Sequence, residues 1–322
     1  MRILITGGAG FIGSNLAAHL LQRPGVELVR VLDNLATGDL KNIKELESNS
    51  KFEFVQGDIR DYASCTAACE DIDLISHQAA LGSVPRSIND PLTTNEVNIT
   101  GTLNVFTAAK EKGIKRVVYA ASSSTYGDHP GLPKVEDVIG NPLSPYAVTK
   151  YVNELYASVY ARTYGLQLIG LRYFNVFGPK QNPAGPYAAV IPLFIKSILD
   201  NEPPTINGDG EHSRDFTFVA NAVYANECAL FTENKEAVNQ VYNIAYGQQT
   251  SLNQLFEMLK ELAGSDLAPK YGPERKGDVK HSLADISKAK NLLGYEPKVN
   301  IREGLKIAFE WYRGQHHFSY ST

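Results

Sequence analysis

Three glycines at regular spacing, Gly7, Gly10 and Gly13, join an apolar run at residues 3–5 to a helical pattern at residues 11–21. Because glycine has no Cβ, a turn of this kind can bend tightly and its backbone can approach a diphosphate. The start of the following helix adds free N–H groups and the positive end of the helix dipole. The strand-turn-helix context therefore predicts a site for a dinucleotide.

Apolar runs and helical patterns alternate through the first half of the chain. Further strands are expected at residues 28–32, 52–55, 74–77, 117–119 and 168–171. Helices are expected at residues 11–21, 62–69, 94–112 and 146–164. This alternation favours a parallel sheet with helices on both faces. We therefore predict an α/β fold built on a Rossmann-type doubly wound parallel sheet.

The alternation loosens after about residue 175, where Gly-Pro and Asn-Pro pairs mark a loop at residues 178–186. Helical patterns return near residues 251–262 and 301–312. A chain of 322 residues is long for one core. We predict a cofactor-binding domain at residues 1–178, to which about 215–245 return. A smaller mixed α/β domain for the substrate would comprise residues 179–214 and about 246–322.

Asp33 ends the second expected strand, twenty positions after Gly13. A carboxylate there can accept hydrogen bonds from the adenosine ribose and would repel a 2′-phosphate. No arginine directly follows Asp33, since Asn34 comes next. NAD is therefore favoured over NADP. Asp58 and Ile59, after the third expected strand, are candidates to cover the adenine.

A second group of residues predicts proton transfer. Tyr146 and Lys150 are four apart at the start of an expected helix, so they project from one face. Ser122 is expected in a loop just after the strand at residues 117–119. Tyrosine has a pKa of about 10, but a nearby ammonium and a positive nicotinamide would favour the phenolate. We predict Tyr146 as the catalytic base, Lys150 as its cationic neighbour and a ligand of the nicotinamide ribose, and Ser122 as a donor to the reacting oxygen.

Composition limits the partners. The chain has 31 Lys and Arg against 35 Asp and Glu, a net charge of −4, so no basic surplus indicates a nucleic-acid or membrane partner. Three scattered cysteines do not suggest a disulfide framework, and no metal signature is seen, so no metal is expected. We see no secretory signal and no apolar run of membrane-spanning length. A cytoplasmic protein is expected.

Motifs along nearly the whole chain resemble those of the extended short-chain dehydrogenase/reductase family, the NAD-dependent epimerases included. The resemblance is carried by the glycine turn, Asp33, Asp58, residues 77–80, residues 122–127, Tyr146 with Lys150, and residues 172–179, 214–216 and 275–278. Residues 81–87 and 122–130 are similar in particular to bacterial UDP-N-acetylglucosamine 4-epimerases. A nucleotide-sugar 4-epimerase is therefore expected.

The resemblance implies a mechanism. Tyr146 would take the proton of the sugar 4-hydroxyl while C4 passes a hydride to tightly bound NAD. The transient 4-keto sugar would turn about its diphosphate link and receive the hydride on its other face. Binding energy from the remote uridine diphosphate would retain this intermediate. The cofactor contacts implied are Gly7, Gly10, Phe11, Ile12, Gly13, Asp33, Asn34, Gly38, Asp58, Ile59, Gln78, Ala79, Ala80, Tyr146, Lys150 and Tyr173.

The resemblance also implies a substrate site. Its contacts would be Gly82, Ser83, Ser123, Asn175, Ala189, Val190, Thr205, Asn207, Arg214, Arg275, Asp278 and Ser282. Two arginines suit a diphosphate, because a guanidinium forms paired charged hydrogen bonds. In the family, the position of Ser282 is a gate at which tyrosine crowds a 2-acetamido group. A serine leaves room for it, so UDP-N-acetylglucosamine and UDP-N-acetylgalactosamine are the expected substrates.

Several alternatives remain open. A UDP-hexosaminuronate 4-epimerase would need a cation near C6, which the sequence does not locate, and Ser282 does not forbid UDP-glucose. Sugar 4,6-dehydratases of the family carry Thr-Asp-Glu where this chain has three serines at residues 122–124, which disfavours that reaction. A non-catalytic NAD sensor is a remote alternative. A homodimer is expected, paired through the helices near residues 94–112 and 146–164.

Overall fold

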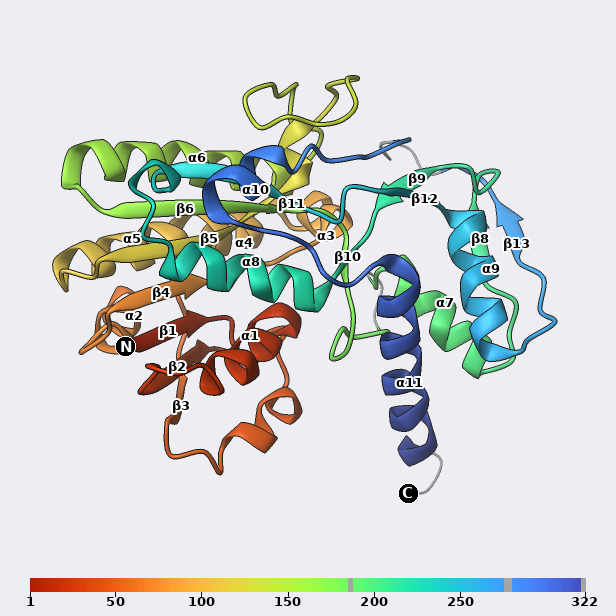
Figure 1. The fold of residues 1–322 in the computed structure, drawn as a ribbon, viewed down its shortest axis with the longest axis horizontal. Helices are drawn as coiled ribbons and strands as arrows, with labels where there is room; N and C mark the ends of the chain where they lie inside the picture. The colour runs from red at the N-terminus through yellow and green to blue at the C-terminus, as the bar shows by residue number, and fades with distance from the viewer. Residues whose placement is uncertain (185–187, 275–279, 320–322) are drawn as a thin grey trace.

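A parallel sheet forms the centre of the computed structural model, which describes residues 1–184, 188–274 and 280–319 (Figure 1). Its strand order is β11-β6-β5-β4-β1-β2-β3, and every neighbouring pair is parallel. The predicted doubly wound α/β fold is confirmed. The strands are β1 (Arg2–Thr6), β2 (Leu28–Asp33), β3 (Phe52–Gln56), β4 (Leu74–His77), β5 (Arg116–Ser122), β6 (Gln167–Tyr173) and β11 (Gln240–Ile244).

Helices cover both faces of the sheet because its strands are apolar on both sides. In β1, Ile3 and Ile5 face one hydrophobic cluster and Leu4 faces another. The first cluster holds α1 (Phe11–Leu21) and α8 (Val219–Phe231). The second holds α2 (Tyr62–Ala68), α5 (Gly101–Glu111) and part of α6 (Pro145–Tyr164). Figure 1 shows α1 and α8 side by side along one face.

The helix expected at residues 94–112 forms, but it begins at Pro91 and contains a π-helical segment. The chain there forms α4 (Pro91–Asn95), a π-helical segment (Glu96–Thr100) and then α5. The buried side chain of Asn98 lies in this π-helical segment. Its Oδ1 accepts from the N–H of Leu81 at 2.8 Å, and its Nδ2 donates to the Leu81 carbonyl at 3.2 Å. Widened turns of this type are common at functional sites. Here the segment fixes the loop that follows β4.

Short sheets and four helices make up most of the C-terminal part. The strand pairs are β7 (Val176–Phe177) with β10 (Thr217–Phe218), β9 (Ser213–Asp215) with β12 (Gln249–Ser251), and β8 (Thr205–Asn207) with β13 (Lys270–Gly272). The helices are α7 (Val190–Leu199), α9 (Leu252–Ala263), α10 (Ser287–Leu293) and α11 (Ile301–Ser319), and α3 (Val84–Asn89) precedes α4. Sequence patterns had indicated only the regions of α9 and α11 among these.

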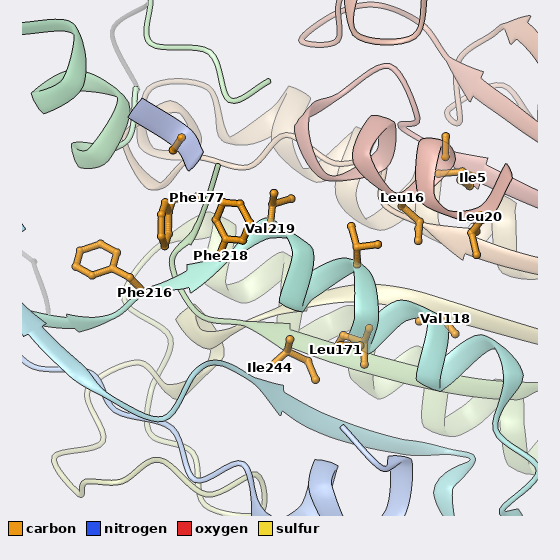
Figure 2. Packing of buried hydrophobic residues seen from close by; sticks show 14 of the residues in the cluster. Ile5, Leu16, Leu20, Val118, Leu171, Phe177, Phe216, Phe218, Val219 and Ile244 are labelled. Atoms are coloured by element: carbon orange, nitrogen blue, oxygen red, sulfur yellow. The ribbon is translucent and has the colours of Figure 1, made fainter. Parts of the chain in front are cut away.

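One hydrophobic core joins the sheet to the C-terminal part. Figure 2 shows Phe177, Phe216 and Phe218 grouped at one end of the cluster, with Leu16 and Leu20 of α1 at the other. The ring of Phe177 meets the other two edge-on, at centroid distances of 6.4 and 5.6 Å. Helix α8 packs on the sheet, and β11 extends it. The division into two domains stays a prediction. In the part of the chain that the structure describes, no helix combines the length and apolar character needed to cross a membrane.

Candidate active site

A cavity of about 590 Å³ lies at the carboxyl ends of β1, β2, β4, β5 and β6. Its size suits a small-molecule or cofactor site, and its position is where open α/β sheets bind ligands. Fifteen of the sixteen predicted cofactor contacts line it. They are Gly7, Gly10, Phe11, Ile12, Gly13, Asp33, Asn34, Asp58, Ile59, Gln78, Ala79, Ala80, Tyr146, Lys150 and Tyr173.

The glycine turn leaves space that side chains would fill. Gly7 has φ of 70°, which favours glycine, and a Cβ added there would lie 2.7 Å from the backbone of Ala79. A Cβ on Gly13 would lie 2.3 Å from the Gly7 carbonyl oxygen. Gly10 precedes α1 and has no side chain to cap it, so the first N–H groups of the helix remain available to an anion. This open cradle fits the diphosphate of NAD.

Asp33 is held at the rim of the turn. Its carboxylate accepts hydrogen bonds from the N–H groups of Ala9 at 2.9 Å and Leu35 at 2.8 Å. Burial raises the pKa of Asp33, and the two backbone hydrogen bonds oppose that rise. With its orientation fixed, this carboxylate can accept hydrogen bonds from the ribose hydroxyls of a dinucleotide.

Asp58 lies beside the same cavity and pairs with Arg60 at 2.7 Å. This hydrogen-bonded guanidinium lowers the pKa of Asp58 to about 2. The side-chain amide of Asn34 donates to the same carboxylate at 2.8 Å. Arg60 was not predicted as a site residue. It lies two residues after Asp58, so its guanidinium and the Asp58 carboxylate share one turn. The pair closes the end of the cavity expected to hold the adenine.

Lys150 and Tyr146 occupy one face of α6, one turn apart. The Lys150 ammonium donates to the carbonyl of Ala120 at 2.8 Å and lies 5.9 Å from the centre of the Tyr146 ring. Burial lowers the pKa of Lys150 to about 8, while the nearby Glu154 carboxylate acts in the opposite direction. Burial raises the pKa of Tyr146, and its hydrogen bond with Ser122 opposes that rise. The phenol therefore needs the lysine's charge to act as a base near neutral pH.

Ser122 is the last residue of β5, not a loop residue as expected, because β5 runs three residues further than the sequence pattern indicated. Its Oγ accepts hydrogen bonds from the N–H of Ser124 at 3.1 Å and from the Ser124 hydroxyl at 2.9 Å. Both acceptor positions of the Ser122 oxygen are thereby occupied. Its own proton is left to donate, and the hydrogen bond with Tyr146 uses it here; donation to the reacting oxygen stays a prediction.

A buried ion pair supports α6 behind Tyr146 and Lys150. Glu154, one turn after Lys150, forms two hydrogen bonds with Arg172 of β6, at 2.8 and 2.7 Å. The Tyr173 hydroxyl donates to Gln78 at 3.2 Å and accepts from Asn226 of α8 at 2.7 Å. Asn226 was not predicted, since it lies in a helix that the sequence analysis did not identify. These contacts fix both walls of the cavity.

A second cavity, of about 430 Å³, adjoins the first and shares Ser122, Ser123 and Asn175 with it. Arg214 and Ser282, both predicted substrate contacts, line this second cavity. Gly82 and Ser83 line the first. The hydroxyl of Ser122 therefore lies where the two cavities meet. Other residues lining the second cavity were not predicted as contacts and include Val84, Pro85, Ile88, Tyr126, Lys134, Leu143 and Phe174.

Some predicted contacts lie elsewhere. Gly38 packs against the backbone of Ala9 and lines neither cavity. The same holds for Ala189 and Val190 at the start of α7, and for Thr205 and Asn207 in β8. Arg275 and Asp278 lie outside the described residues. Within the described ranges, no group of three or more His, Cys, Asp or Glu side chains is arranged to hold a metal ion.

Known proteins match this chain over almost its full length. A putative UDP-glucose 4-epimerase of Methanocaldococcus jannaschii is 39% identical, over 96% of this chain and 97% of its own length. The structure of a UDP-N-acetylglucosamine 4-epimerase from Methanobrevibacter ruminantium, in complex with UDP-N-acetylmuramic acid, superimposes with a TM-score of 0.92 at 39% identity and covers 98% of both chains. A Bacillus cereus UDP-glucuronic acid 4-epimerase, in complex with UDP-glucuronic acid and NAD, gives a TM-score of 0.91 at 34% identity, over 98% of this chain and 100% of the other.

The sequence pattern of one family, described as the NAD dependent epimerase/dehydratase family, matches residues 3–245. That range contains the glycine turn, Asp33, Ser122, Tyr146 and Lys150. The expected family and the expected cofactor are both confirmed. The chain belongs to the NAD dependent epimerase/dehydratase family, and its cofactor is NAD.

Proposed function

We propose that the chain interconverts UDP-N-acetylglucosamine and UDP-N-acetylgalactosamine by inverting C4 of the sugar. It is an NAD-dependent nucleotide-sugar 4-epimerase, as its relatives are named. The observation that carries the proposal is the meeting of two cavities at Ser122. One cavity is built for the dinucleotide, and the other is free for the sugar, so the reacting carbon can lie between them.

The chain's own residues would hold and move the proton. When bound, NAD supplies a reversible hydride acceptor for C4. Tyr146 would remove the proton from the 4-hydroxyl, and Lys150 would stabilise the phenolate. Ser122, whose acceptor positions Ser124 occupies, would donate to the same oxygen in place of its present hydrogen bond with Tyr146. The glycine turn would bind the diphosphate of NAD, and Asp33 its adenosine ribose.

The small side chain of Ser282 supports the N-acetylated sugar. Ser282 lines the second cavity, and its backbone N–H donates to the Ser213 carbonyl at 3.1 Å. Its hydroxyl accepts from the N–H of Asp215 at 3.4 Å. The residue is thus fixed in place without occupying the volume that a larger side chain would take. A 2-acetamido group would use that volume.

Purified protein should interconvert the two acetylated UDP-sugars without added NAD. Ser282→Tyr should reduce kcat/KM for UDP-N-acetylgalactosamine by about 100-fold, because overpacking a binding cavity costs several kcal/mol. The loss for UDP-galactose should stay within about threefold. A coupled assay on both sugars measures this ratio. Equal losses for the two sugars would reject Ser282 as a gate. If protein with verified bound NAD interconverts no UDP-hexose, the proposed activity is rejected.

We also propose a homodimer, supported by apolar side chains on α6 that the described part of the chain leaves about half exposed. Val148, Leu155 and Val159 are 46%, 50% and 44% exposed, and their spacing places them on one helical face. Leu92 of α4 is 77% exposed, and α4 packs directly against α6. An exposed apolar face of this kind is typical of an interface between two copies.

A further inference from the structure

A buried lysine, Lys134, lines the second cavity. It is 4% exposed, and its ammonium donates to the carbonyl of His129. Lysines are almost never fully buried unless a counter-charge is present. Among the described residues no carboxylate lies within ion-pair distance of Lys134, and burial lowers its pKa. Within the described ranges, the positive charge at this cavity wall therefore has no carboxylate partner.

The backbone holds Lys134 beside the segment that carries Ser282. The N–H of Lys134 donates to the Leu283 carbonyl at 2.7 Å, and its carbonyl accepts from Asp285 at 2.9 Å. Asn243 of β11 donates to the same carbonyl at 2.9 Å. These bonds fix Lys134 at the wall of the cavity that Ser282 also lines.

A buried ammonium favours an anion over a neutral group, because a charged hydrogen bond in a dry site is stronger than a neutral one. The cavity already holds polar side chains for a sugar, including Ser123, Ser124 and Asn175. Its other cation, Arg214, donates to the carbonyls of Ser213 and Lys280 at 3.0 and 3.1 Å. The carbonyl of His129 satisfies only one of the three N–H donors of Lys134.

We propose that Lys134 is a specificity-determining residue that pairs with a carboxylate on the sugar, so that this site accepts 6-carboxylated N-acetylhexosamines as well as the neutral ones. The inference rests on the proposed function, since it assumes that the second cavity holds the sugar of a nucleotide sugar. It supplies the cation that sequence patterns did not locate. A reaction that oxidises C6 of an acetylated UDP-hexose would provide such a substrate.

The test compares two sugars that differ only at C6, UDP-N-acetylglucosamine and its 6-carboxylate. Their dissociation constants are measured by calorimetry on the NAD-loaded Tyr146→Phe protein, where turnover is suppressed. Lys134→Gln keeps a donor for the His129 carbonyl but removes the charge, and Lys134→Arg keeps the charge. Lys115→Met is the matched control, because Lys115 is exposed at the opposite end of β5 from Ser122.

Lys134→Gln should weaken binding of the carboxylated sugar about tenfold or more and that of the neutral sugar by less than about threefold. Lys134→Arg should retain most of the preference, and Lys115→Met should change neither constant. Equal weakening of both sugars, or a lowered melting temperature with no change in preference, would assign Lys134 a purely structural role and overturn the inference. Because binding needs no turnover, this result is separable from a failure of the epimerase activity.

Discussion

In the proposed mechanism, several side chains around Tyr146 must together make its phenol basic. Burial raises the pKa of Tyr146, so its hydrogen bond with Ser122 is not enough to produce a base near neutral pH. Lys150 supplies a positive charge one helical turn away, and the carbonyl of Ala120 holds that ammonium at 2.8 Å. The site thus depends on a charge that is itself destabilised by burial.

Tyr146→Phe should keep bound NAD and lose most turnover. The ring still fills the same space, but no oxygen remains to take the proton of the sugar hydroxyl. A positioned acid or base contributes about 10²–10⁴-fold, so kcat should fall by that amount. NAD content of the purified variant, measured after denaturation, provides the control. A near-normal kcat would reject Tyr146 as the base.

The pH dependence should reflect Lys150. Its pKa is lowered to about 8 by burial, so the side chain is charged below that pH and neutral above it. We expect kcat/KM to fall above about pH 8, roughly tenfold by one unit higher. Lys150→Arg stays charged in this range and should move the alkaline limb beyond pH 10, at a lower maximal rate. An alkaline limb that stays near pH 8 in this variant would show that another group controls it.

The residues identified from the sequence are those in local patterns. Ser122, Tyr146 and Lys150 follow strand and helix signals, and the structure brings them to one cavity. Lys134 belongs to the irregular segment between Tyr126 and α6, where no periodicity indicates which side chains point inward. Its place depends on pairing with residues 283–285, about 150 positions away. Long-range contacts of this kind cannot be inferred from one local pattern.

At the level of elements, the strand-turn-helix unit at the N-terminus is the most constrained part. Gly13→Ala would place a methyl group 2.3 Å from the Gly7 carbonyl oxygen, so the turn must open. We expect a loss of about 1–3 kcal/mol in unfolding free energy and a much lower NAD content after dialysis. Gly314→Ala on the exposed face of α11 has open space and should stabilise by about 0.5–1 kcal/mol. If Gly13→Ala keeps both its bound NAD and its stability, the glycine turn does not bind the diphosphate as proposed.

Other elements show where sequence patterns stop being informative. The helix near residues 94–112 has a continuous pattern, but one turn of it is π-helical, and Asn98 in that turn binds the Leu81 backbone. In α8 the residues facing the sheet and those facing α1 are both apolar, so the helix shows little periodicity and was not identified. Because α8 has tertiary contacts on two sides, it lacks the one-sided apolar periodicity from which a helix is predicted.

At the scale of the whole molecule, one hydrophobic core joins the two parts of the chain, and a separate small cluster that includes Tyr126 and Phe174 lines the second cavity. The cluster that holds Leu16 and Val118 of the first part also holds Phe256 and Leu305 of the C-terminal part. The cavity proposed for the sugar is therefore held partly by its own cluster, which also contains Ala284, two residues after Ser282. A substitution in the C-terminal part can therefore move Ser282 relative to Ser122, even when the substituted residue lies far from the glycine turn.

The proposed dimer is a prediction about this same scale. Leu155→Glu would place a carboxylate in the apolar face of α6, where a second copy is expected to bury it. An unpaired buried charge should weaken association about 100-fold or more, so the variant should be a 35.3 kDa monomer at micromolar concentration. Ile307→Glu, on α11, replaces a side chain of similar exposure and should leave the dimer intact. Light scattering after size-exclusion chromatography measures both masses. If wild-type protein elutes as a monomer, or Leu155→Glu keeps twice the monomer mass, α6 is not the interface.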